Sequence, residues 1–112
     1  MSLEASFVAP GVTTNYSPDA DVDAGEVVVQ NQLVGIAERA ISASVQGALT
    51  HRGIFSMPKS GTSGESLAVG VKVYWDAVNR VVTSTAGQNV YVGKVAVAAD
   101  EDDTSVKVRL EQ

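Results

Sequence analysis

The stretch GVKVYWDAVNRVVT, residues 70–83, decides the fold class. Its first half alternates between two kinds of residue, so that one face of a strand would carry Val71, Val73 and Trp75. Residues 76–79 contain Asp and Asn, which favour turns, and residues 80–83 are again apolar and β-branched. The stretch therefore predicts a β-hairpin.

Further strands are expected on the C-terminal side of this hairpin. Residues 87–89 predict a turn, residues 90–99 an apolar strand and residues 100–103 a solvated acidic turn. Residues 106–110 alternate strictly, which predicts a last strand with one buried face. Across this region, two sets of side chains are expected to lie on opposite faces. The buried ones are Val71, Val73, Trp75, Val106, Val108 and Leu110, and the outward ones are Lys72, Lys107 and Arg109.

On the N-terminal side, residues 26–30 predict a strand that turns at residues 31–32 into a second strand over residues 33–37. A helix over residues 31–41 is the alternative, because its apolar residues fall near one helical face, although Gly35 weakens a helix. Residues 41–50 alternate between apolar and small polar side chains and predict one strand, whose phase continues through His51. Residues 59–65 predict a flexible loop.

Closely spaced strands and turns predict an all-β protein, a small sandwich or barrel of antiparallel strands with an extended N-terminal arm. We place the arm at residues 1–20 and a single β domain at residues 21–112. A parallel βαβ architecture does not fit, because no long amphipathic helix separates the strands.

Composition narrows the function classes. The chain has no cysteine, so disulfides and cysteine-ligated metals are excluded. The net charge of −5 argues against nucleic-acid binding by a basic face and against anionic membrane surfaces. Residues 1–5 lack a basic segment before an apolar run, so we expect no secretory signal.

No pattern in the sequence predicts catalysis, a cofactor or a metal. His51 is the only histidine and lies in phase with Leu49 and Phe55, which favours a structural role over a catalytic one. The acidic residues at 19, 21 and 23 lack the glycine and glutamate that a calcium loop requires. The stretch at 61–64 lacks the Gly-Lys-Ser/Thr signature of a phosphate loop.

The arm is instead the main candidate for binding. It has no periodicity, yet it carries aromatic and apolar side chains that a solvated tail would not need. We expect it to dock on a neighbouring subunit or on a shell, although packing on its own domain is the alternative. The predicted interface residues are Phe7, Val8, Tyr16, Pro18 and, on the outward face of its strand, Tyr74.

Several stretches, taken in order, resemble one known family. They are GIFSMPK at 53–59, GVKVYWD at 70–76, NVYVG at 89–93 and VKVRL at 106–110, preceded by AGEV at 24–27 and LVGIA at 33–37. In this order and spacing they resemble the phage capsid cement, or head-decoration, proteins over roughly residues 14–110.

The resemblance implies a structural phage or prophage protein that decorates and stabilises the assembled capsid by binding between shell subunits. It implies the major capsid protein as partner, self-association as a homotrimer, a place on the outer capsid surface of the virion, and synthesis in the host bacterial cytoplasm. It brings no catalytic residues. Two alternatives remain: another virion component, such as a head–tail joining or tail protein, and a carbohydrate-binding β module that uses exposed tyrosines.

Overall fold

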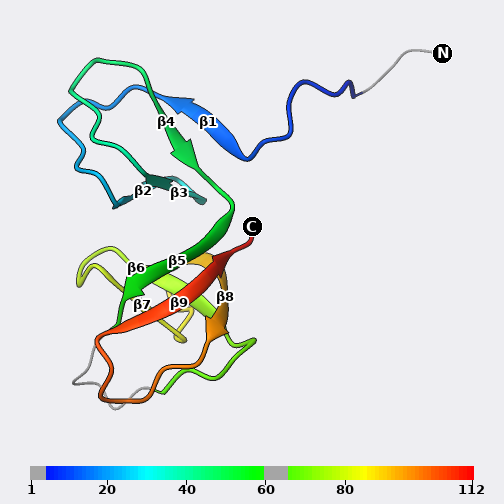
Figure 1. Cartoon of the computed structure of the whole chain (residues 1–112), viewed down its shortest axis with the longest axis vertical. Helices are drawn as coiled ribbons and strands as arrows, with labels where there is room; N and C mark the ends of the chain where they lie inside the picture. Colours follow the sequence, from blue (N-terminus) through cyan, green and yellow to red (C-terminus); the bar gives the residue numbers. More distant parts are fainter. Residues whose placement is uncertain (1–4, 60–65) are drawn as a thin grey trace.

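The computed structural model describes residues 5–59 and 66–112, and over these residues it is all-β. The nine strands are β1 (Thr13–Tyr16), β2 (Glu26–Gln30), β3 (Leu33–Ala37), β4 (Gly47–Thr50), β5 (Gly53–Pro58), β6 (Lys72–Asp76), β7 (Val81–Thr83), β8 (Val90–Val97) and β9 (Ser105–Leu110). They form a four-stranded sheet, in the order β1-β4-β3-β2, and a five-stranded sheet, in the order β5-β9-β8-β6-β7. The predicted all-β fold of antiparallel strands is confirmed, and of the two predicted forms, sandwich and barrel, the strands take the sandwich (Figure 1).

The five-stranded sheet includes the two stretches that alternate most regularly, residues 71–75 in β6 and 106–110 in β9. The expected hairpin forms as β6 and β7, and the Asp76 carboxylate accepts N–H bonds from Val78 at 3.0 Å and Asn79 at 3.1 Å in its turn. The sheet curls so that Lys59, the residue after the edge strand β5, forms one parallel bridge with Val82 of the other edge strand, β7. This bridge covers part of an edge that would otherwise be open.

The two sheets share the larger core. Val27, Val34 and Ile36 of β2 and β3 pack in one cluster with residues of the five-stranded sheet such as Val73 and Trp75. The predicted inward and outward residues are confirmed: Val73, Trp75, Val106, Val108 and Leu110 are buried, Val71 is partly buried, and Lys72, Lys107 and Arg109 are exposed.

The hairpin of β2 and β3 is buried on both faces. One face joins the larger core, and on the other Val28 and Ala37 form a smaller cluster with Leu49 of β4. This double burial explains why residues 27–29 and 33–37 are apolar without the alternation of a strand that has one solvated face. The turn expected at residues 31–32 is confirmed, with Asn31 at φ 57°, and the alternative helix over 31–41 is wrong.

The prediction of one strand over residues 41–50 is wrong. Only Gly47–Thr50 is a strand, and Ile41 forms a single bridge with Val22. Ser44 has φ 64°, and its N–H donates to the carbonyl of Pro18 at 2.8 Å, so the chain turns there. A residue in the left-handed conformation interrupts the alternation of side chains between the two faces of a strand. Val45, which the alternation placed on the apolar face, is consequently 54% exposed.

The segment assigned to the N-terminal arm divides into two parts. Thr13–Tyr16 is the strand β1 and pairs with β4, whereas residues 5–12 lie outside both sheets and lead away from them (Figure 1). The carbonyl of Val12 accepts the N–H of His51 at 2.8 Å, which fixes the point where the free part begins. Part of the loop predicted at 59–65, including the stretch 61–64, lies outside the described residues.

Candidate functional site

The arm presents the most exposed aromatic side chain of the described chain. Phe7 is 84% exposed and Val8 is 90% exposed. All of residues 5–12 are exposed. Because exposed apolar surface of this kind is costly in water, these two residues are candidates for contact with another molecule.

The other two predicted arm residues contact their own chain. Tyr16 lies in β1 and packs against the smaller core cluster, and Pro18 is buried. The carbonyl of Pro18 also accepts the Ser44 N–H, as described above. Both residues therefore have an intramolecular role in attaching β1 to the four-stranded sheet.

Tyr74, the remaining predicted interface residue, lines a hollow on the outer face of the five-stranded sheet. Its ring lies 5.7 Å from that of Tyr91, at an interplanar angle of 62°, which is a favourable edge-to-face arrangement. The hollow has a volume of about 430 Å³ and is lined by Lys72, Tyr74, Tyr91, Lys94, Glu111 and Gln112.

A row of like charges crosses this face. Lys72 of β6 pairs in register with Lys94 of β8, and Lys94 pairs with Arg109 of β9. All three are exposed. We call these three residues the basic row. Lys72 and Arg109 were predicted to point outward, but the alignment of the three residues depends on strand order and register, which local sequence does not indicate.

Glu111 is the acidic group beside this row. Its Oε2 lies 3.7 Å from Lys94 Nζ. Among the described residues, this carboxylate oxygen has no hydrogen-bond partner. Burial, and then the negative charge of Glu111 and the nearby Tyr74, raise the pKa of Tyr91. The Tyr91 hydroxyl therefore stays protonated at neutral pH and can donate a hydrogen bond to an anion.

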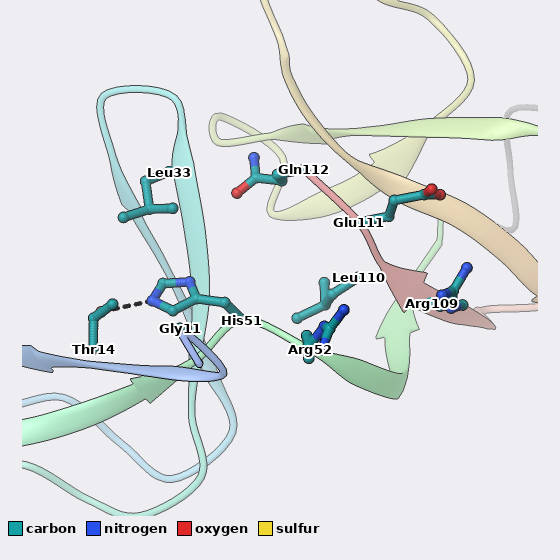
Figure 2. A pocket seen from close by; sticks show the side chains of 9 residues that line it. All are labelled: Gly11, Thr14, Leu33, His51, Arg52, Arg109, Leu110, Glu111 and Gln112. Carbon is teal, nitrogen blue, oxygen red and sulfur yellow. Dashed lines mark hydrogen bonds between the residues drawn. The ribbon is translucent and has the colours of Figure 1, made fainter. Parts of the chain in front are cut away.

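A cleft of about 350 Å³ lies where the two sheets meet and contains His51 (Figure 2). Because the Val34 carbonyl can only accept, His51 Nδ1 donates to it, at 2.8 Å. His51 Nε2 lies 2.6 Å from the Thr14 hydroxyl. Both ring nitrogens thus have partners inside the chain, and through them His51 connects β1 with β3.

Gln112 is the last residue and lies at the same junction, where Figure 1 shows the C-terminus between the two sheets. Its Oε1 accepts the Val34 N–H at 2.8 Å, and its Nε2 donates to the carbonyls of Gln32 and Tyr91, each at 2.7 Å. One side-chain amide therefore connects β3, the turn before it and β8. The sequence offered no signal for this contact, which joins residues about 80 positions apart.

An ordered acidic turn lies at the opposite end of the β8–β9 hairpin. Asp100, Glu101, Asp102 and Asp103 are all exposed. Lys59 is only 3% exposed, and its Nζ donates to the carbonyls of Glu101 at 3.2 Å and Asp103 at 3.4 Å. Because Lys59 binds the backbone carbonyls here, it also holds the turn in a defined conformation. We call residues 100–103 the acidic turn.

The remaining acidic candidates support the structure. The Asp21 carboxylate accepts the N–H of Ala43 at 2.8 Å and so anchors the irregular segment before β4.

Within residues 5–59 and 66–112 there is no group of three His, Asp or Glu side chains placed to hold a metal ion. The same residues include no helix of the length and apolarity needed to cross a membrane.

The comparisons with known proteins agree with the resemblance found in the sequence. The model of the family described as phage cement protein matches residues 8–110. No curated protein and no solved structure matches the chain. The matched segment begins inside the arm and ends with β9, so it includes both sheets. The chain therefore belongs to the phage cement proteins, structural proteins that stabilise the capsid of a bacteriophage.

Proposed function

We propose that this protein binds the outer surface of the assembled capsid, across contacts between subunits of the major capsid protein. In this proposal it is made in the host cytoplasm, acts as a homotrimer and has no catalytic activity. The family supports association with a capsid shell. A small domain that binds at many equivalent positions stabilises a shell by mass action, because each bound copy favours the assembled state.

The exposed arm is the observation that carries this proposal. Phe7 and Val8 are almost fully exposed, and they lie on a segment that the sheets do not need for pairing. An extended segment with apolar anchors can add to a strand edge or fill a groove on a partner. Pro10 restricts the backbone of this segment and so reduces the entropy lost on docking.

A truncation tests the role of the arm. Deleting residues 2–10 removes Phe7 and Val8 but keeps Val12 and its hydrogen bond to His51. We expect the truncated protein to melt at the same temperature as the full chain and to lose occupancy on capsids assembled without it. Occupancy is measured by sedimenting the capsids and quantifying the bound protein. A truncated protein that binds capsids normally would overturn the role proposed for the arm.

The chain also offers a matched control for a point substitution. Val8 is 90% exposed on the arm, and Val78 is 91% exposed in the β6–β7 turn. We expect Val8→Ser to weaken capsid binding and Val78→Ser to leave it unchanged. Equal losses would show a general dependence on exposed apolar surface and would contradict a specific arm contact.

Copy number separates cement from another virion component. A cement protein covers the shell in many copies, whereas a head–tail joining protein forms one ring at a single vertex. We expect protein quantification of purified particles to give an abundance comparable to that of the major capsid protein. An abundance matching a single ring would overturn the proposed location.

A further inference from the structure

The basic row is an unusual arrangement for an isolated acidic protein. Directly opposite side chains on neighbouring antiparallel strands have Cβ atoms about 4.5–5.5 Å apart, and like charges at such positions destabilise a sheet. Lys72, Lys94 and Arg109 nevertheless occupy three successive strands in register. The whole chain has only 8 basic residues against 13 acidic ones, so this grouping places scarce positive charge on one face.

The chain itself neutralises this row only in part. Lys94 has the partner Glu111 at 3.7 Å, and the two side chains are 46% and 40% exposed. In the part of the chain that the structure describes, neither Lys72 nor Arg109 forms an ion pair. The face thus retains positive charge beside the two tyrosines of the hollow. Such a face is suited to carboxylates presented by another molecule.

The acidic turn has the complementary charge but cannot reach the row of its own chain. Asp100 follows Lys94 by six positions along extended strand and turn, which corresponds to roughly 20 Å at the rise of a β-strand. Lys59 and the hydrogen bond from the Asp100 N–H to Asp103 Oδ2, at 2.8 Å, hold the turn at that end of the hairpin. The two surfaces therefore point to a contact between copies.

We propose that the acidic turn of one copy docks on the basic row and its hollow in the next copy. The contact joins different surfaces of the two copies, and such a contact closes a ring when the rotation between copies closes, as it does in the proposed trimer. The carboxylates of the turn would lie against Lys72, Lys94 and Arg109, with the tyrosine hydroxyls as additional donors. This inference rests on the proposed self-association and names the surfaces that produce it.

Charge reversal tests the pairing. The row variant carries Lys94→Glu and Arg109→Glu, and the turn variant carries Asp100→Lys and Asp102→Lys. A four-site variant combines them, reverses both surfaces and keeps the net charge at −5. We expect the row and turn variants each to self-associate at least about tenfold more weakly than the wild type, because like charges then face each other. The four-site variant should regain the wild-type oligomer.

The measurement is molar mass by light scattering over a concentration series, at low and at high salt. Wild-type association should weaken as salt rises, because exposed charges are screened. Thermal melts check that every variant is folded. Arg39→Glu is the matched control for Arg109→Glu, because it changes the charge equally on an exposed residue outside the row. It should leave the oligomer intact.

The outcomes distinguish this inference from the proposed function. If the wild type is a monomer at all concentrations, the proposed self-association fails. If the wild type associates and the row variant associates equally well, the inference is overturned while self-association stands. If the row variant associates normally but binds capsids poorly, the row contacts the shell protein instead, and the inference is again overturned. A folded four-site variant that stays monomeric would also contradict the direct pairing.

Discussion

The two sheets of this protein are held together in different ways. In the five-stranded sheet every neighbouring pair of strands has several residues in register, and the pairing of β5 with β9 runs over all six positions. In the four-stranded sheet the strand pair β1–β4 and the hairpin β2–β3 are joined by a single pair of residues in register, Ile36 with Thr50. At Val34, where β4 does not continue the ladder, the backbone bonds to side chains instead. Its N–H donates to Gln112 and its carbonyl accepts from His51.

This difference indicates that the five-stranded sheet is the more stable part and that the strand pair β1–β4 is more weakly attached. A continuous ladder and a shared core make opening costly, whereas a strand pair attached by one residue pair and a small cluster opens more easily. The arm extends from the weaker part through β1. Substitutions of the same kind in the two sheets should therefore have unequal effects.

The largest expected difference is between the two cores. Trp75 is 3% exposed in the larger core, and Arg80 lies 5.2 Å from its ring centroid and donates to the Val27 carbonyl at 3.3 Å. We expect Trp75→Ala to lower the free energy of unfolding by about 3–5 kcal/mol. Tyr16→Ala, in the smaller cluster, should cost only about 1 kcal/mol, because its ring is half-buried. Urea unfolding measures both, and equal losses would contradict the comparison.

Two glycines give a second pair of substitutions. A Cβ on Gly93 of β8 would lie 2.0 Å from the Arg109 carbonyl oxygen, which is backbone of the paired strand. A Cβ on Gly47 of β4 would meet the side chain of Ile41 at 2.7 Å, and that side chain can move. We expect Gly93→Ala to cost about 3 kcal/mol and Gly47→Ala about 1 kcal/mol, because only the first forces strands apart. Thermal melts that rank them in reverse would overturn this explanation.

The same difference explains how much of the fold could be predicted. Strict alternation in residues 71–75 and 106–110 identified both the strands and their buried faces, because period and burial coincide there. Residues 41–50 alternate as well, but Ser44 adopts a left-handed conformation that no local pattern indicates. Its N–H bonds to Pro18, a contact that arises only when distant segments meet.

The candidate site was predicted in part for the same reason. Phe7, Val8 and Tyr74 could be chosen as exposed apolar or aromatic residues from local sequence alone. The basic row could not be recognised, because Lys72, Lys94 and Arg109 become neighbours only through strand order and register. Tyr16 and Pro18 looked like arm residues, but a short edge strand brings them against their own chain.

A smaller effect is expected at the junction of the sheets. Gln112 makes three hydrogen bonds that link β3 and β8, yet it is exposed to solvent, which can replace them in part. We expect Gln112→Ala to cost about 1 kcal/mol in urea unfolding. Gln112→Glu should be at least as damaging, because a carboxylate cannot donate to the carbonyls of Gln32 and Tyr91. A Glu variant as stable as wild type would show that these two bonds contribute nothing.

The smallest expected effect concerns the β6–β7 turn and depends on pH. Hydrogen bonds from the backbone and then the side chain of Asn79, and to a lesser extent from the N–H of Val78, hold the pKa of Asp76 below its ordinary value of 3.8. A carboxyl whose pKa is lower in the folded state stabilises the protein above the unfolded pKa, and this contribution is lost as the pH falls through the folded pKa. At neutral pH, Asp76→Asn should therefore melt at a lower temperature than the wild type. This difference in melting temperature should narrow as the pH falls below 3.8.

Asp19→Asn, at an exposed carboxylate outside the turn, is the control and should show no such gap. If the gap at Asp76 were the same at every pH, the effect would come from the geometry of the amide and not from the charge.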